Sequence, residues 1–420
     1  MSPQYLSPGV YIEEVDKGAK PIEGVGTSVA AFVGFAEQGP VNAPTLVSNW
    51  TQFRDTFGGF IEDSFMAYAV YGYFHNGGGT CYIVRVGEDD NNPEPSASAK
   101  KDEEEEKKPP PKPRSKSPIS AATFIGDVAK RTGLGSLEAI DQVTMVIIPD
   151  IMAAVQKRSF TASDVQAVQS AMMAHCEKMK DRFAIIDAPP DLSPQQVERW
   201  RSRDAGYDSK YAALYYPWIQ VTNPLGNGKP LLIPPSGHVA GVYARSDAER
   251  GVHKAPANEV VRGALGLAMQ VTKEEQDTLN PVGVNCIRAF PGRGIRIWGA
   301  RTVSSDPSWR YINVRRLFNF VEESIEQGTQ WVVFEPNDVD LWERVKRDIT
   351  AFLTRVWRDG ALFGRTAAEA FYVKCDEELN PVEVRDAGQL IIEIGLAPVK
   401  PAEFVIFRIS QWAGGGEVAE

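Results

Sequence analysis

The chain has 420 residues, of which 43% are hydrophobic and 24% are charged, the composition of an ordinary globular protein. This length is enough for two or three domains with sizeable cores. The formal net charge of −10 argues against a general nucleic-acid or anionic-membrane binder, because such proteins present a basic field. No apolar run approaches the ~20 residues that span a bilayer. The first residues also lack the basic and apolar regions of a secretory signal, so we expect a protein made and folded in the cytoplasm.

Residues 1–87 are predicted to be mostly extended. Runs rich in β-branched and aromatic residues predict strands at 9–15, 27–36 and 80–86. The apolar segment 64–79 predicts a buried helix that ends at Asn76 and the glycines after it. Residues 88–117 then contain no aromatic and almost no apolar side chain, and they include the run KPPPKP. We expect an exposed, largely extended linker over 88–118, because such a segment cannot bury enough surface to become ordered.

The remainder of the chain alternates between strand-like and helix-like segments. A strand at 142–150, a helix near 161–181 and a strand at 182–190 predict an α/β layer with parallel strands, extended by a strand at 210–221. Farther on, the predicted elements are a helix at 258–279, strands near 284–302, helices near 310–327 and 339–359, and a strand at 330–336. The fold class is therefore α/β, in a mixed α+β arrangement.

The sequence contains no recognisable catalytic, cofactor-binding or metal-binding motif. The four cysteines are far apart and form no CxxC pair, so they are expected to be buried free thiols. The four histidines have no metal-ligand spacing. Pro230 stands where the hydroxyl of a P-loop would be, and the glycines of 292–299 are expected to be turn residues. Ser236 lies two residues before a histidine, but no nucleophile-elbow glycine precedes it.

The end of the chain is unusual because it predicts a strand where a frayed terminus is expected. The strand-forming residues are Phe404, Val405, Ile406, Phe407 and Ile409. This strand could fold back on its own sheet, or it could pair with the sheet edge of another subunit. Similar strand-like residues occur near the other end of the chain, at Val10, Tyr11, Ile12 and Val15.

Several blocks of sequence, in the same order, resemble contractile tail sheath proteins. The first block comprises LSPGVYIEEV (6–15), GTSVAAFVGFAEQGPVNAPTLV (26–47) and NGGGTCYIVRV (76–86). The middle block comprises IPPSGHVAGVYARSDAERGVHKAPAN (233–258) and NPVGVNCIRAFPGRGIRIWGART (280–302). The last comprises DPSWRYINVRRL (306–317), WVVFEPNDVDLWERV (331–345), FLTRVWRDGALFG (352–364), AFYVKCD (370–376) and APVKPAEFVIFRI (397–409). Residues 119–230 match less well, as expected for the variable outer domain of that family.

The resemblance implies a structural protein that is not an enzyme and needs no cofactor. Many copies would form a helical sleeve around an inner tube, with baseplate and terminator or cap proteins at its ends, in a phage tail or a released injection particle assembled in the cytoplasm. Neither nucleic-acid contact nor direct membrane insertion is expected. The implied domains are an N-terminal arm (1–22), a core domain in two parts (23–87 and 231–399), the linker (88–118), an inserted outer domain (119–230) and a C-terminal arm (400–420).

Two sets of assembly residues follow from this resemblance. The strand-like residues at both termini would link subunits, and the acceptor of the C-terminal strand would be Leu390, Ile391, Ile392 and Ile394. On the helix predicted from Val339, an apolar stripe leaves four arginines within about 80° of arc on a different face. These candidate tube-facing residues are Arg344, Arg347, Arg355 and Arg358. The alternative for this face is a solvated surface with pairs of opposite charge along the helix.

Two other functions stay open on the sequence alone. An α/β enzyme with an unrecognised site would remain a small oligomer with a polar pocket. A sheath variant that caps or initiates the sleeve would not polymerise.

Overall fold

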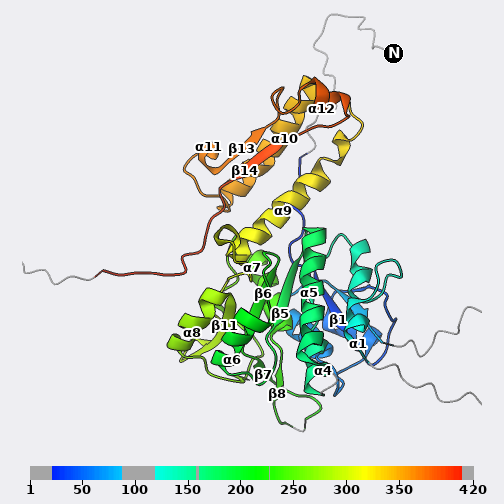
Figure 1. The fold of residues 1–420 in the computed structure, drawn as a ribbon, viewed down its shortest axis with the longest axis vertical. Coiled ribbons are helices and arrows are strands. Elements are labelled where there is room, and N and C mark those ends of the chain that lie inside the picture. The colour runs from blue at the N-terminus through cyan, green and yellow to red at the C-terminus, as the bar shows by residue number, and fades with distance from the viewer. Residues whose placement is uncertain (1–20, 88–118, 158–159, 227, 409–420) are drawn as a thin grey trace, which may run out of the picture. The chain divides into compact units, whose positions relative to one another are not determined.

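A computed structural model describes residues 21–87, 119–157, 160–226 and 228–408 (Figure 1). The chain divides into two compact units. Unit 1 comprises Met1–Val25 and Val321–Ala397, and unit 2 comprises Gly26–Phe320 and Pro398–Glu420. The predicted linker and the arm residues Val10, Tyr11, Ile12, Val15 and Ile409 lie outside the described residues. The domain boundaries predicted from the sequence do not coincide with the boundaries of these two units. The predicted domains stay a prediction.

Unit 2 is built on a nine-stranded sheet with the order β2-β3-β1-β4-β5-β6-β11-β12-β9. The strands from β3 to β11 in this order run parallel, while β2, β12 and β9 are antiparallel to their neighbours. Their bounds are β1 (Ala30–Gly34), β2 (Thr45–Val47), β3 (Cys81–Arg85), β4 (Met145–Ile147), β5 (Phe183–Asp187), β6 (Ala212–Tyr216), β9 (Glu259–Val260), β11 (Val284–Phe290) and β12 (Gly294–Ile297). The parallel α/β layer predicted from the sequence is thereby confirmed.

The central strands are apolar throughout because helices cover the sheet. Every residue of β1, β4, β5 and β6 is buried, which is why these strands read as continuous apolar runs and do not alternate with polar residues. Helix α2 packs on α7, and α3 and α4 pack on α5. The helices of unit 2 are α1 (Trp50–Phe57), α2 (Met66–His75), α3 (Ala121–Ile125), α4 (Asp150–Gln156), α5 (Ala162–Met179), α6 (Pro194–Arg199), α7 (Ser236–Arg250) and α8 (Lys273–Leu279). A smaller sheet joins β10 (Gly266–Leu267), β7 (Ile219–Val221) and β8 (Leu231–Ile233).

Unit 1 combines helices with a two-stranded sheet. Strand β13 (Phe371–Lys374) pairs antiparallel with β14 (Glu393–Leu396), and α10 (Val339–Arg358) contacts β13. The remaining helices are α11 (Ala367–Ala370) and α12 (Val382–Asp386). The boundary between the units falls within α9 (Ile312–Gly328), whose first part belongs to unit 2 and whose last part belongs to unit 1.

Two predicted elements are wrong. The helix predicted at 258–279 is helical only in its last seven residues, α8. Left-handed backbone at Asn258 (φ 59°) and Gly263 (φ 84°) breaks the preceding segment into β9, β10 and loops. The strand predicted at 330–336 is a short 3-10 helix, Gln330–Val332, followed by a turn in which Phe334 has φ 67°. Val333 and Phe334 are exposed, while Trp331 and Val332 are half-buried.

Candidate functional site

Glu403 anchors the base of the C-terminal arm to unit 2. Its carboxylate accepts hydrogen bonds from Arg301 Nε (2.9 Å), Arg301 Nη2 (2.7 Å), Asn280 Nδ2 (2.6 Å) and the Tyr311 hydroxyl (3.0 Å). Burial acts to raise the pKa of Glu403, but the hydrogen bonds from Arg301 and Asn280 outweigh burial and hold that pKa below its usual range. The anchor is therefore a charged group that stays ionised at neutral pH.

Directly after this anchor, four apolar residues of the described chain are exposed. Asn313 Nδ2 also donates to Val399 O (3.1 Å), so unit 2 holds the base of the arm at two points. The side chains of the next four residues are 69% to 82% exposed, namely Phe404, Val405, Ile406 and Phe407. Through Arg408, where the described part of the chain ends, these residues form no strand. The predicted pairing of 404–409 with another subunit stays a prediction. Strands need a neighbouring strand for their backbone hydrogen bonds, and this segment has none within the described chain.

The sheet of unit 1 offers unpaired edges. Strands β13 and β14 pair only with each other among the described residues, so each has one open edge. Of the predicted acceptor residues, Ile394 lies in β14, while Leu390, Ile391 and Ile392 precede it. The backbone of Ile391 is already satisfied, because its N–H donates to Asn380 Oδ1 (2.7 Å) and its carbonyl accepts from Asn380 Nδ2 (2.9 Å). Pairing with a donated strand is thus geometrically open along β14 and not at Ile391.

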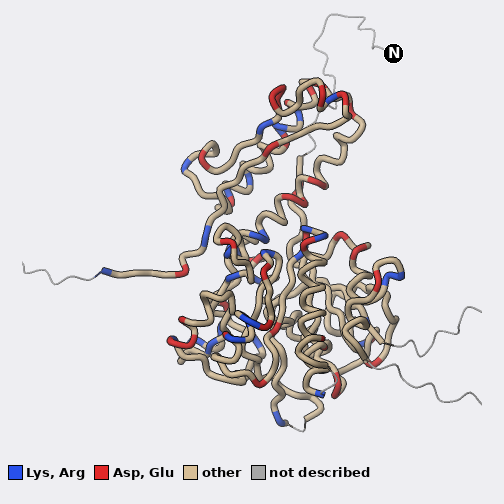
Figure 2. The backbone as a smooth tube through the Cα atoms, viewed as in Figure 1, with Lys and Arg blue, Asp and Glu red and all other residues tan. Residues whose placement is uncertain are grey.

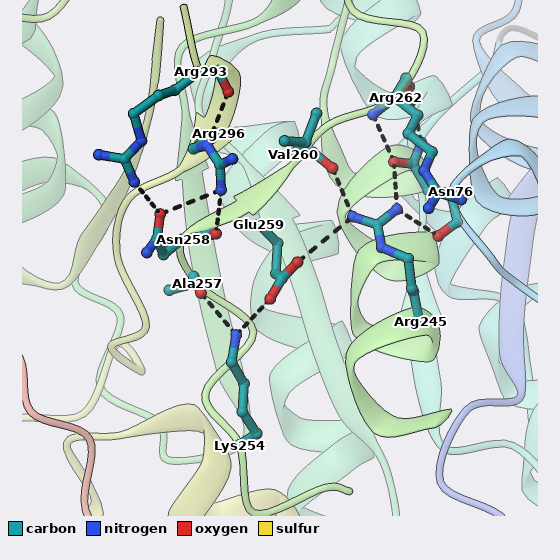
Figure 3. A network of polar contacts seen from close by, with 10 residues as sticks. All are labelled: Asn76, Arg245, Lys254, Ala257, Asn258, Glu259, Val260, Arg262, Arg293 and Arg296. Atoms are coloured by element: carbon teal, nitrogen blue, oxygen red, sulfur yellow. Dashed lines mark hydrogen bonds and ion pairs between the residues drawn. The ribbon is translucent and has the colours of Figure 1, made fainter. Parts of the chain in front are cut away.

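The edge of the large sheet at β9, in contrast, is capped by side chains (Figure 3). Arg245 Nη2 donates to Val260 O (2.7 Å), and Arg296 Nη1 donates to Asn258 O (2.7 Å). Lys254 Nζ binds Glu259 Oε1 at 2.7 Å. Charged groups on an edge strand oppose pairing with another chain. Arg245 and Arg296 therefore close this edge.

Helix α10 has the predicted apolar stripe. All of its predicted members are buried, namely Leu341, Val345, Ile349, Phe352 and Val356. A strip of this kind buries one helix face and leaves the opposite side free for other contacts. The stripe prediction is confirmed.

The four arginines of α10 do not form one free basic surface. Arg344 lies over the Trp331 ring (5.3 Å to the centroid) and 3.6 Å from a carboxylate oxygen of Glu335. Arg347 Nε is 3.2 Å from Oδ1 of the buried Asp348. Arg355 donates to the carbonyl of Ile22, a fully buried residue of the same unit. Arg358 is exposed. All four arginines are exposed, and Arg344 and Arg355 also bind groups of unit 1 outside the helix. Their role as tube-facing residues stays a prediction.

The buried carboxyl groups of unit 2 cap helices. Asp187, at the end of β5, accepts from Ser236 N (2.9 Å) and Ser236 Oγ (2.5 Å) at the start of α7. Burial raises the pKa of Asp187 to about 7. Asp150, at the end of β4, accepts from backbone N–H groups at the start of α2 and from Ser64, and burial raises its pKa to about 6. Ser236 and Asp187 are almost fully buried and bonded to each other, so the pair holds β5 and α7 together.

The described residues contain no group of three or more metal-ligating side chains suited to an ion. Among those same residues, none of the helices has the length and apolar character needed to cross a membrane. The four cysteines are buried and free, as predicted. Of the glycines of 292–299, Gly292 lies in the turn between β11 and β12 as predicted, whereas Gly294 begins β12 and Gly299 follows it. Gly292 and Gly294 have positive φ.

Sequence reasoning missed two functional features. One is the anchoring role of Glu403, which its position directly before the apolar residues of the arm could have indicated. The positive φ of Phe334 left no signal, because nothing in the residue types of 330–336 distinguishes a displayed turn from a strand.

Comparison with known proteins points to one family. A family model described as phage tail sheath protein central domain matches residues 129–303, and one described as phage tail sheath C-terminal domain matches residues 304–411. The tail sheath protein of Escherichia phage P2 is 24% identical over 422 residues, which cover 95% of this chain and 94% of that protein. Two other curated tail sheath proteins, each 29% identical, are matched over 63% and 28% of their own lengths.

Solved structures give the same result at the level of the fold. The chain is similar to the helical sheath of the anti-feeding prophage (AFP) in its contracted state, with 32% identity, a TM-score of 0.73, and coverage of 97% of this chain and 100% of that chain. It is similar to the sheath of the extracellular contractile injection system PVC in its contracted state, with 29% identity, a TM-score of 0.74, and coverage of 98% and 99%. A chain of the AFP baseplate is 32% identical, with a TM-score of 0.71 and coverage of 97% and 99%.

Proposed function

Because the chain belongs to the phage tail sheath protein family, we propose that it is a structural sheath subunit and not an enzyme. Many copies form a helical sleeve around an inner tube, and the sleeve contracts to drive that tube through a target membrane. Identical contacts that repeat without closing generate a helix of subunits, which is the assembly that this function needs.

The anchored but unpaired C-terminal arm is the observation that carries this proposal. Its base is held by Glu403 and Val399, while Phe404 to Phe407 expose apolar side chains and unsatisfied backbone groups. An exposed apolar strand is an aggregation liability in a protein that works as a monomer. In an assembled sleeve the same strand pairs with the open edge of β14 in a neighbouring copy. The N-terminal arm is proposed to link subunits in the same way.

The partners follow from the same assembly. We propose contacts with further copies of this chain, with the inner tube protein, and with baseplate and terminator or cap proteins. Similar chains occur in both a helical sheath and a baseplate structure, which supports a position along the sleeve as well as beside the baseplate. The arginine-bearing side of α10 is the proposed tube-facing surface.

An extracellular injection particle is the proposed setting. The AFP and PVC chains are 28% to 32% identical to this chain over at least 96% of its length. The phage P2 protein reaches 24% over a comparable length. A sheath variant that caps or initiates the sleeve without polymerising is the alternative within the family.

Truncation after Ala402 tests the proposal. The shortened chain keeps both units, and we expect it to fold as a soluble subunit that forms no tubes when it is produced alone or with its tube protein. Negative-stain microscopy of the full chain should show long sleeves, and circular dichroism should give the same secondary structure for both chains. Normal tubes from the truncated chain would contradict the role of the arm, and a capping variant would form no long tubes even at full length.

A further inference from the structure

Ile22, at the base of the predicted N-terminal arm, is fully buried in unit 1. The chain is described from Pro21 onward, and residues 21–25 lie beside the last part of α9 without forming a helix or strand (Figure 1). A segment of this kind stays ordered where buried apolar contacts and hydrogen bonds hold it. The contacts of Ile22 therefore show how the base of the arm is held.

Gly328, the last residue of α9, leaves the space that Ile22 occupies. A Cβ added at Gly328 would lie 2.7 Å from both γ carbons of Ile22 and 3.0 Å from its Cβ. The γ carbons of a β-branched residue have little freedom to move aside, because few χ1 rotamers are allowed. Any side chain at position 328 would therefore displace Ile22, and glycine permits the close approach.

Hydrogen bonds from two helices fix the backbone around this contact. Arg355 Nη2, on α10, donates to the carbonyl of Ile22, and Val25 N donates to Ser324 Oγ on α9 (3.1 Å). Acidic residues are interspersed with basic ones over unit 1 (Figure 2), yet within the described chain Arg355 binds this carbonyl and no carboxylate. A hydrogen bond from a charged donor is stronger than one from a neutral donor. We name Ser324, Gly328 and Arg355 the Ile22 anchor.

We propose that the Ile22 anchor positions the N-terminal arm for its contact with a second copy of this chain. The inference rests on the proposed function and adds to it the residues that hold this arm. An arm that starts from a fixed base loses less conformational freedom when it binds, so the Ile22 anchor strengthens the contact without touching the second copy. Glu403 holds the C-terminal arm in unit 2, so the two arms start from different units. A force on the N-terminal arm therefore acts first on unit 1, and a force on the C-terminal arm acts first on unit 2.

A reversible disulfide tests whether the fixed base matters. The double variant Ile22→Cys, Gly328→Cys replaces the close packing with two thiols whose Cβ atoms start 3.0 Å apart. Disulfides form at Cβ separations of ~3.5–4.5 Å, so a small shift of the backbone closes the bond. The four native cysteines are buried, which limits side reactions. We expect the oxidised variant to form sleeves at the concentration of the unaltered chain, and the reduced variant to need at least about tenfold more.

The unaltered chain, treated with the same oxidant and reductant, is the control for this experiment. Sleeves formed as readily by the reduced variant as by the oxidised variant would overturn the proposal. Failure of the disulfide to form would overturn it too, as would a lack of sleeves in both redox states while the unaltered chain forms them.

A matched pair of substitutions on α10 separates positioning of the arm from contact with the tube. Arg355→Ala removes the hydrogen bond to Ile22, whereas Arg358→Ala removes an exposed arginine at the end of the same helix. In single subunits, hydrogen exchange at the Val25 amide should accelerate about tenfold in Arg355→Ala and stay unchanged in Arg358→Ala. When each variant is produced without the tube protein, sleeve yield should fall for Arg355→Ala alone.

Equal exchange at Val25 in the two variants would overturn the proposal. Full sleeve yield from Arg355→Ala together with weaker retention of the tube would overturn it as well, and would assign Arg355 to the tube surface. If the unaltered chain itself formed no sleeves, the proposed function would fail, which is a separate outcome because the exchange measurement does not depend on assembly.

Discussion

Glu403 is a charged residue that directly precedes the apolar part of the C-terminal arm, and its carboxylate fixes the base of that arm to Arg301. Its side chain is 18% exposed and that of Arg301 is 11% exposed, so their ion pair is largely shielded from solvent. A pair of this kind contributes more than a surface pair, since it is screened less and leaves unpaired groups when one partner is removed. The base of the arm is therefore tied to unit 2 by chemistry that depends on ionisation.

We predict that Glu403→Gln loosens the arm without unfolding the subunit. The amide removes the charge and places a donor where Arg301 or Tyr311 also donates, at a cost on the order of 1–2 kcal/mol. Hydrogen exchange at residues 399–403 should accelerate, and sleeve yield should fall. Glu378→Gln is the matched control, because Glu378 pairs with Lys374 through a side chain that is 80% exposed.

The same anchor has a defined pH dependence. The pKa of Glu403 is lowered in the folded chain, so its stabilisation is present at neutral pH and is lost as the pH falls through the folded-state pKa. Protection of residues 399–403 should decline on acidification in the unaltered chain. Glu403→Gln should show no such decline, and an equal decline in both would contradict the assignment to Glu403.

We predict that the raised pKa of Asp187 gives the core of unit 2 a pH dependence opposite to that of the Glu403 anchor. Burial raises its folded-state pKa to about 7, above the ordinary value of 3.8, so its contribution to stability is greatest below pH 3.8 and is lost as the pH rises toward 7. The slope for one carboxyl is at most about 1.4 kcal/mol per pH unit. Asp187→Asn keeps partners for Ser236 and should flatten the change in urea midpoint between pH 5 and pH 8. Asp164→Asn, at an exposed helix cap, should leave the slope intact.

At the scale of elements, the four exposed arginines of α10 differ in whether they also bind groups outside the helix. Arg355 bonds to Ile22, and Arg344 is engaged by Trp331 and Glu335. Reversal of all four arginines would therefore disturb the fold of unit 1 together with any tube contact. Arg347 and Arg358 give the cleaner test.

We predict that Arg347→Glu combined with Arg358→Glu yields sleeves that are empty or that slip from their tubes. Exposed charges are screened over ~10 Å at 0.1 M salt, so tube retention by the unaltered chain should also weaken as salt is raised. Lys346→Glu, on the same helix and paired with Glu343, is the control. Electron microscopy that shows tube-filled sleeves from the double variant would point to another tube-facing element.

The elements that the sequence predicted correctly are those whose pattern and burial agree. The parallel strands β1, β4, β5 and β6 are continuous apolar runs because both faces of the sheet are covered, and α10 shows its apolar stripe. The segment 330–336 failed because its strand-forming residues serve an exposed turn. The segment 404–408 forms no strand in the described chain, and its predicted pairing with another subunit stays a prediction. Residue types indicate that a segment favours a strand conformation, but they do not identify which chain supplies the neighbouring strand.

At the scale of the whole molecule, the chain passes between the units at three points, after Val25, after Phe320 and after Ala397. On the unit 2 side, Arg316 forms an ion pair with Asp247, and their side chains are 4% and 5% exposed. The Thr27 hydroxyl donates a hydrogen bond to the same carboxylate. On the unit 1 side, Val25 N donates to Ser324 Oγ (3.1 Å). The passages after Val25 and after Phe320 are thus held by contacts within each unit. The sequence could not reveal this division, because residues far apart in the chain build both sides.

The proposed exchange of arms would keep subunits linked while the sleeve contracts, so the source of energy for contraction can be considered separately. We propose that work is stored during assembly in a metastable extended sleeve. If contraction buries an additional few hundred Å² of apolar surface per subunit, each subunit releases several kcal/mol at ~25 cal/mol per Å², before ordering costs are subtracted. Summed over many subunits, this release is the proposed source of the work that drives the tube through a membrane without chemical fuel.

Contraction is therefore predicted to begin in nucleotide-free buffer when a mild denaturant or acid lowers the barrier between the two states. Extended sleeves should shorten at the same rate with and without added ATP, since the energy is already present in the assembled contacts. Contracted sleeves should not extend again when the trigger is removed, because the contracted state is the more stable one. Time-resolved electron microscopy of purified particles measures both outcomes. A strict requirement for ATP, or spontaneous re-extension, would show that the energy comes from a source other than the assembled sheath.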